Sequence, residues 1–412
     1  MLDLSECFIL KLPDSIGRLK QLGYLNAPRI RGRMVPECIT ELLNLRYLSL
    51  HGSCSILALP ELIGEMKGLV HLDLSGCMAI EKLPESFGDL KSLEHVDFTG
   101  CKNITGVSQC LAGLTKLHYL NLSNCENIGD LPRALGSLTE LQYLNLFDFS
   151  YLSGNKLVEA AFLGSLTKLK YLNLSSSNEL DIIRLPEALG SLTGLKYLNL
   201  SHHSRMEKLP ASFGNLCNLV HLDLSHCYYL RDVTADLNRL TKLQYLDLYV
   251  CGCSDYDNLE GLQEVFGKLS ELRHLNLGYC TEVSHPDKRN GLLGQIFTLT
   301  NLEYLNLCEN DFDSIPETLS NLRKLHTLDL SSCRHLQRLP ASISRVDSLK
   351  FLYTTGCEKL DTSTMPQYTS STRMPQDFVN HAGDGESSSY TFQLEYETSD
   401  RLMISRQKRQ VL

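Results

Sequence analysis

A short alternation of apolar and polar residues recurs along most of the chain. In the stretch from Leu69 to Leu90 (LVHLDLSGCMAIEKLPESFGDL), leucines alternate with His71, Asp73 and Ser75, which predicts a short strand with its leucines on one face. The apolar residues that follow are more widely spaced, and Pro84 has no amide hydrogen to donate to a sheet, so this half predicts an irregular return segment. Each unit therefore consists of a strand and a return segment around one apolar layer.

The unit returns every 23 or 24 residues along most of the chain. One unit alone buries too few apolar side chains to offset the entropy lost on ordering it, so it is stable only in a stack of similar units. A partial copy opens the chain with Leu2 and Leu4. The leucines that start the later strands are Leu22, Leu45, Leu69, Leu93, Leu117, Leu141, Leu169, Leu195, Leu219, Leu243, Leu272, Leu302, Leu325 and Leu349.

Fifteen units in register predict an α/β solenoid over residues 1–360. We expect a horseshoe with a parallel β-sheet on its concave face and irregular or short helical segments on its convex face. The longer repeats predict extra loops at residues 149–159, 254–259 and 284–293. Residues 361–412 lose the period and are rich in Ser and Thr, which predicts a mostly disordered tail in which the alternation over 390–397 could add one capping strand.

The positions of the prolines indicate which kind of solenoid the chain resembles. Nine of the thirteen prolines occupy one position of the return segment, seven of them in Leu-Pro pairs, and Cys or Asn recurs nine positions into the coil. The pairs are Leu12-Pro13, Leu59-Pro60, Leu83-Pro84, Leu131-Pro132, Leu185-Pro186, Leu209-Pro210 and Leu339-Pro340, with the variants Val35-Pro36 and Ile315-Pro316. This pattern resembles the leucine-rich repeat, and more narrowly the repeat region of plant nucleotide-binding, leucine-rich-repeat disease-resistance proteins.

The resemblance implies a recognition module for a protein partner, either a pathogen effector or a host protein modified by one. It also implies an upstream nucleotide-binding module that the repeats restrain. The first coil has no polar cap, so we expect this chain to be the downstream piece of a longer protein. The nearest approach to a phosphate-binding loop, Gly261 to Lys268, has five residues between its glycines and is followed by Leu269, where Ser or Thr should hold magnesium. Nucleotide binding is therefore not carried over to this chain, and we expect no cofactor.

Two other classes of function remain open from the sequence. One is a general intracellular leucine-rich-repeat scaffold that binds small GTPases, although that class keeps a stricter 23-residue Asn-type repeat. The other is a ubiquitin-ligase substrate receptor, which shares the recurring cysteine but usually lacks the Leu-Pro pair. We favour the plant defence interpretation because it accounts for both features.

The net charge and the positions of the cysteines limit the partners and the cellular compartment that we expect. The net charge is −9 and no apolar run approaches the ~20 residues that cross a membrane, so we expect neither a nucleic-acid nor a membrane partner. Nine of the fifteen cysteines occupy the same inward position of the repeat, where neighbouring thiols would lie one strand spacing apart. An oxidising compartment would endanger such a ladder, which favours the cytoplasm, or the nucleus, and a structural role for the thiols.

The predicted concave face presents two rows of polar side chains. Tyr or His recurs at the third position of each strand, and Asp or Asn two residues later, which we interpret as a tyrosine-rich protein-binding surface. The candidate binding residues are Tyr171, Asn173, Tyr197, Asn199, His221, Asp223, Tyr245, Asp247, His274, Asn276 and Tyr304.

A metal or catalytic site on the same face is disfavoured. His71, Asp73, His95 and Asp97 are of the ligand types that suit zinc, but Tyr and Asn fill the same positions elsewhere, so we expect no metal. No serine or cysteine nucleophile is singled out beside the His and Asp residues, and we expect the protein not to be an enzyme.

Overall fold

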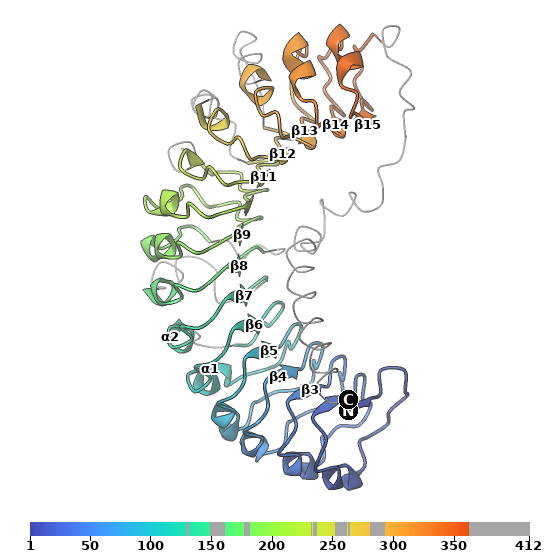
Figure 1. Ribbon diagram of the computed structural model, residues 1–412, viewed down its shortest axis with the longest axis vertical. Helices are drawn as coiled ribbons and strands as arrows, with labels where there is room; N and C mark the ends of the chain where they lie inside the picture. The colour runs from blue at the N-terminus through green and yellow to red at the C-terminus, as the bar shows by residue number, and fades with distance from the viewer. Residues whose placement is uncertain are drawn as a thin grey trace. The chain divides into compact units, whose positions relative to one another are not determined.

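The described strands lie in one parallel sheet of 15 strands, in the order in which they occur along the chain (Figure 1). The computed structural model describes residues 1–128, 132–148, 161–176, 182–231, 233, 237–251, 262, 264–280 and 293–361, all within the unit Met1–Tyr368. The strands are β1 (Leu2–Asp3), β2 (Tyr24–Asn26), β3 (Tyr47–Ser49), β4 (His71–Asp73), β5 (His95–Asp97), β6 (Tyr119–Asn121), β7 (Tyr143–Asn145), β8 (Tyr171–Asn173), β9 (Tyr197–Asn199), β10 (His221–Asp223), β11 (Tyr245–Asp247), β12 (His274–Asn276), β13 (Tyr304–Asn306), β14 (Thr327–Asp329) and β15 (Phe351–Tyr353).

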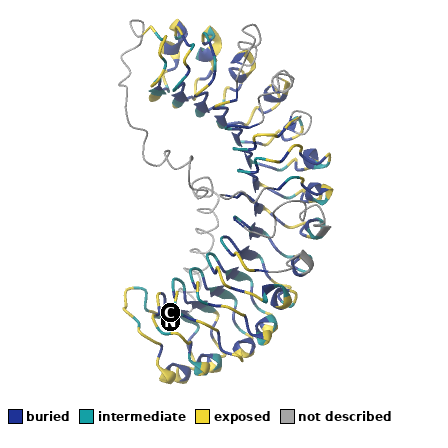
Figure 2. Cartoon of the chain, turned by 180° about the vertical axis from the view of Figure 1, so that it is seen from behind, coloured by how far each residue is buried: buried dark blue, intermediate teal, exposed yellow. Residues whose placement is uncertain are grey.

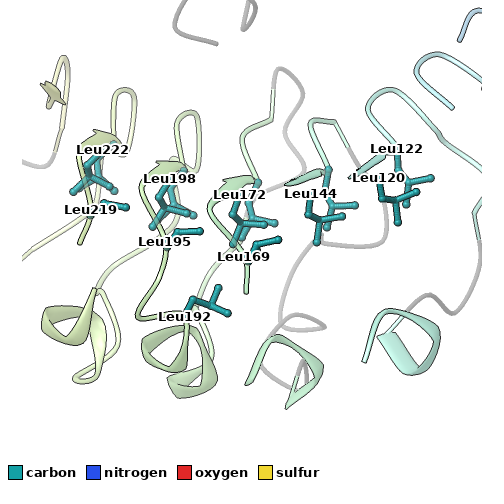
Figure 3. Close-up of a cluster of buried hydrophobic side chains, with 14 of the residues drawn as sticks. Leu120, Leu122, Leu144, Leu169, Leu172, Leu192, Leu195, Leu198, Leu219 and Leu222 are labelled. Carbon is teal, nitrogen blue, oxygen red and sulfur yellow. The ribbon is translucent and has the colours of Figure 1, made fainter. Parts of the chain in front are cut away.

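Equivalent residues of successive coils pair with one another. Leu144 pairs with Leu172, and Leu172 with Leu198, so the middle residues of the strands form one row whose side chains are completely buried. Figure 3 shows this row with the leucines that flank it, including Leu169 and Leu195. The predicted stack of fifteen coils, each opened by a core leucine, is confirmed, and the partial first copy pairs through Leu2 with the coil of β2.

Short helical turns lie on the side of the coil stack away from the strands (Figure 1). They begin directly after the proline of the repeat in many coils, because proline fixes φ near −65° and leaves no amide unpaired at a helix start. The turns are η1 (Asp14–Arg18), η2 (Glu37–Glu41), η3 (Ile63–Glu65), η4 (Glu85–Asp89), α1 (Val107–Leu111), α2 (Pro132–Leu135), η7 (Ala161–Ser165), η8 (Glu187–Ser191), η9 (Phe213–Asn215), η10 (Glu317–Asn321) and η11 (Ala341–Arg345).

Burial follows the repeat in the described coils. In Figure 2 the buried residues run through the coil interiors from strand to strand, while exposed residues are concentrated in the turns. Phe87 and Phe98, from neighbouring coils, are both completely buried, with ring centroids 6.0 Å apart. The apolar core is therefore one continuous column to which each coil adds a layer.

Buried thiols join neighbouring coils at the ends of several strands. Cys101 donates its thiol hydrogen to the carbonyl of Leu74, one coil back, at 3.1 Å, and Cys125 makes the same bond to Phe98 at 3.1 Å. Burial raises the pKa of the Cys125 thiol to about 12. The predicted inward, structural role is found for buried thiols such as those of Cys101 and Cys125, but it is wrong for Cys7, which is exposed in the partial first coil.

Other residue types fill the same position. Asn310 donates to the carbonyls of Leu277 (2.8 Å) and Leu307 (2.9 Å). His203 takes the place of the cysteine in the coil of β9, and its Nε2 lies 2.7 Å from the carbonyl oxygen of Leu174. A hydrogen-bonding side chain, most often cysteine, is therefore the usual occupant of this position, and the apolar Ile30 takes it in the coil of β2.

Several predictions from the sequence concern residues outside the described part of the chain. They are the loops at 149–159 and 254–259, most of the loop at 284–293, the tail at 362–412 and its capping strand at 390–397.

The thiol row predicts a sharp division in cysteine reactivity. Iodoacetamide at pH 7.5 is expected to label exposed Cys54 and Cys217 in the folded chain. Cys101 and Cys125 are expected to react only after unfolding, because burial excludes the reagent and raises their pKa. Peptide mass spectrometry with and without 8 M urea measures both groups, and equal labelling of the two groups in the folded chain would contradict the assignment.

Close packing between the helical turns gives a second prediction. A Cβ added to Gly64 in η3 would lie 2.1 Å from the carbonyl oxygen of Ser86 in the next coil. We expect Gly64→Ala to lower the free energy of unfolding by about 1–3 kcal/mol. Gly294→Ala is the matched control, because no atom lies within 4 Å of its added Cβ, and urea denaturation should show no loss there. Equal stability of the two variants would show that the turns do not touch as described.

Candidate functional site

The first residues of β2 to β13 form a continuous stack of aromatic and imidazole rings, which we call the ring row. Neighbouring strands of a parallel sheet lie about 4.8 Å apart, so rings at equivalent positions meet face to face. The centroid separations range from 3.8 Å between His95 and Tyr119 to 4.3 Å between Tyr24 and Tyr47, with the planes nearly parallel. The row comprises Tyr24, Tyr47, His71, His95, Tyr119, Tyr143, Tyr171, Tyr197, His221, Tyr245, His274 and Tyr304.

The ring row is less open than the alternation alone predicted. Tyr143, Tyr171 and Tyr197 are completely or almost completely buried. The expectation that these side chains face solvent is therefore wrong for the middle of the row. The four predicted binding rings that follow are half-buried; they are His221, Tyr245, His274 and Tyr304.

The third residues of the strands form a second row, and its main contacts are with the chain itself. Asn199 accepts the backbone N–H of Ser201 at 2.8 Å, and Asp247 accepts that of Tyr249 at 2.9 Å. A side chain that bonds its own backbone two residues on stabilises a tight turn, which explains why Asp or Asn recurs where each strand ends. The predicted binding residues that make this bond are Asn173, Asn199, Asp223, Asp247 and Asn276.

All five of these predicted residues are buried. Each commits one side-chain oxygen to the turn, and Asp247 uses its other oxygen to accept from Asn276 at 3.0 Å. The turn residues therefore hold the strand ends in place, and in β10 to β13 the half-buried rings are the part of the predicted set with exposed surface.

Burial controls the charge of this face. Burial raises the pKa of Asp223 to about 7, with a further contribution from the neighbouring charge of Asp247, whose own pKa burial raises to about 6. Burial lowers the pKa of His71 to about 4, so its ring is neutral at neutral pH. The face is consequently less charged than its Asp and His content implies.

The four residues of zinc-ligand type, His71, Asp73, His95 and Asp97, make other contacts. His71 and His95 lie face to face with ring centroids 3.9 Å apart, as members of the ring row. Asp73 accepts hydrogen bonds from Ser49 and Ser75, and Asp97 from the backbone N–H of Thr99. Within the described ranges, no group of three or more His, Cys, Asp or Glu side chains is arranged to hold a metal ion.

Sequence reasoning missed the edge beside the strand ends of β9 to β13. There His202, His226, Val250, Tyr279 and Glu309 occupy an equivalent position with φ between 53° and 64°. Three earlier coils have glycine at that place, at residues 52, 76 and 100, and three others have Arg29, Asn124 and Asp148. The run of bulky residues in consecutive coils was the available signal, but it becomes informative only once the backbone conformation is known.

Comparison with known proteins places the repeat pattern in a family. A model of the leucine-rich repeat region matches residues 31–147 and 144–292, and a single leucine-rich repeat model matches residues 301–322. Among solved structures, a leucine-rich repeat protein of Leptospira interrogans is 24% identical, with 88% of this chain and 91% of that chain aligned and a TM-score of 0.67. An internalin of Listeria monocytogenes is 20% identical, with 84% and 87% aligned and a TM-score of 0.51. At these identities the likeness concerns the fold alone.

Curated plant proteins match shorter segments. TMV resistance protein N of Nicotiana glutinosa is 36% identical over 72 residues, or 18% of this chain, and disease resistance protein RPS4B of Arabidopsis thaliana is 29% identical over 109 residues, or 26%. Receptor-like protein 39 of Arabidopsis thaliana is 38% identical over 95 residues, or 22%. The aligned segments span 6%, 8% and 11% of those three proteins. The predicted resemblance to the repeat region of plant resistance proteins is thus found over parts of the chain.

No described helix has the length and apolar character needed to span a membrane.

The buried carboxylates predict a pH-dependent stability. The pKa of Asp223 is higher in the folded chain than in the unfolded one, so this group costs stability progressively as the pH rises from about 4 to about 7. Asp223→Asn is expected to raise the free energy of unfolding by about 1–3 kcal/mol at pH 8 and to change it little at pH 4. Asparagine fits because Asn199 makes the same turn bond in β9.

Urea denaturation at the two pH values tests this prediction. The matched control is Asp73→Asn, in which the replaced carboxylate accepts bonds from the Ser49 and Ser75 hydroxyls, and no gain at pH 8 is expected there. A gain for Asp223→Asn that is equal at both pH values would contradict the electrostatic cause.

Proposed function

Because the chain belongs to the leucine-rich repeat family, we propose that it is a non-catalytic module that recognises another protein through the half-buried rings of β10 to β13. The observation that carries this proposal is the ring row. It places His221, Tyr245, His274 and Tyr304 side by side on strands held in register by the turn residues. Rigid aromatic side chains provide contact area at a low entropic cost on binding.

We further propose that the module belongs to a plant disease-resistance receptor of the innate immune system. The matches to two plant resistance proteins and the recurring Leu-Pro and cysteine pattern support this assignment. In this proposal the repeats sense a pathogen effector or a host protein, and they also regulate an upstream nucleotide-binding module. The recurrence of cysteine at one repeat position, which places thiols on neighbouring coils, supports a reducing compartment, the cytoplasm or the nucleus, over an extracellular one.

The recognition proposal predicts a separation of binding from stability. The double variant Tyr245→Ala with His274→Ala is expected to bind the partner at least tenfold more weakly, because truncation of central aromatic side chains at an interface typically costs 2 kcal/mol or more. Quantitative co-purification with the tagged chain from its source tissue measures the loss.

Leu246→Ala serves as the control for unfolding. Leu246 lies next to Tyr245 on β11 and is completely buried, and its truncation is expected to cost about 2–5 kcal/mol of stability. If the double variant retains the same co-purifying proteins, or unfolds as readily as Leu246→Ala, the rings are not a recognition surface.

The immune assignment is tested by the transcript from the source. A coding sequence that continues upstream of Met1 into a phosphate-loop domain supports the disease-resistance receptor. A mature transcript that starts at Met1 contradicts that assignment but leaves the recognition module intact.

A further inference from the structure

One backbone position has a left-handed conformation in coil after coil, directly behind the strand. It is glycine at residues 52, 76 and 100, which adopts positive φ without a steric cost. Other coils hold larger residues there: Arg29, Asn124 and Asp148 in earlier coils, His202, His226, Val250, Tyr279 and Glu309 beside β9 to β13, and Ser332 beside β14. Asn and Asp tolerate this conformation better than other residues with a Cβ, so the bulky residues in the five consecutive coils of β9 to β13 point to a role for the side chains at this edge.

Side chains at or next to this position in the five coils of β9 to β13 form what we call the loop-edge row: His202, His226, Tyr249, Tyr279 and Glu309. The rings of His202 and His226 stack with centroids 4.3 Å apart, and the ring of Tyr249 meets His226 edge-on at 5.2 Å. Tyr279 and Glu309 are exposed, and Tyr249 is half-buried. The loop-edge row is separate from the ring row, whose members lie four or five residues earlier in each coil.

Tyr249 spans two coils because of a glycine. A Cβ added to Gly278 would lie 2.7 Å from the Tyr249 ring and 2.8 Å from the sulfur of Cys308, so the ring lies directly over the backbone of the intervening coil. Its hydroxyl thereby reaches Glu309, sixty residues further along the chain, and donates to Oε1 at 3.3 Å. Burial, and then the charge of Glu309, raise the pKa of Tyr249, so the hydroxyl remains a donor at neutral pH.

We propose that the loop-edge row is a second docking surface and takes an arginine or lysine side chain from a segment of the protein partner. Tyrosine ring faces attract cations, and an exposed carboxylate beside the ring supplies the counter-charge and a hydrogen-bond acceptor. The neighbouring imidazoles do not oppose a cation, because burial lowers the pKa of His202, and that of His226 to about 4, and keeps both rings neutral. An anionic ligand would meet Glu309 unfavourably. The inference rests on the proposed recognition function and adds the chemistry of the partner.

A peptide selection on the intact chain tests this assignment. A random dodecapeptide phage library is panned on the immobilised full-length chain, and binding of the selected peptides is measured by fluorescence anisotropy. Peptides that contain Arg or Lys should be enriched, and Tyr249→Ala or Glu309→Gln should weaken their binding about tenfold or more. Enrichment of peptides without basic residues, or unchanged binding to Glu309→Gln, would overturn the proposal.

Tyr279→Gly keeps the test independent of folding. Glycine is the residue best suited to φ 55°, so this variant should retain or raise the melting temperature while it weakens peptide binding. Unchanged peptide binding by this stable variant counts against the loop-edge row.

The ring-row variant Tyr245→Ala with His274→Ala separates this inference from the recognition proposal. Peptides that this double variant loses but Glu309→Gln retains would overturn the cation site and leave recognition by the ring row standing. If no peptide is enriched above an unrelated control protein, both proposals fail.

Discussion

The in-register pairing of parallel strands is the constraint on which the rest of the structure depends. Each strand bonds to its neighbours at equivalent residues, as Tyr171, Leu172 and Asn173 do with the residues of β9. A repeat position in sequence therefore becomes a row in space, at a spacing of about 4.8 Å. The leucine, thiol, ring and turn rows are four products of the same pairing, and each coil is stabilised chiefly by the two coils beside it.

This relation explains how much could be read from the sequence. The leucine period was sufficient for the strands and the stack, and the prolines for the return segments between strands, because each follows from a local rule. The inward cysteines were also predicted, although His203 was not, since a histidine gives no indication in sequence that it stands where other coils have a thiol. The alternation of apolar and polar residues predicts on which face of the sheet a side chain lies, but not which other groups cover that face. The burial of Tyr171 and Tyr197 was therefore not predicted.

The sequence predicted which residues of the candidate site lie in rows, but not the contacts that these residues make. The recurring Asp and Asn residues looked like binding groups, yet a short turn bond such as that of Asn199 accounts for them within the chain itself. The loop-edge row was missed because its signal is a backbone dihedral angle, which the hydrophobic period does not report. Family membership fixes the fold and the general role, whereas the identity of a partner depends on side chains that vary from coil to coil, such as Tyr249 and Glu309.

The thiol row has a consequence for the ageing of the protein. Each buried sulfur, such as that of Cys101, carries the donor that ties one coil to the carbonyl of the coil before it. Oxidation to a sulfinic or sulfonic acid would add charge and bulk at a site with no room for either, and the change is irreversible for most proteins. Because each coil is stabilised chiefly by its neighbours, one oxidised cysteine would weaken the contact between two coils and divide the solenoid into two shorter stacks. The redox history of the cell would in this way set the working lifetime of the chain.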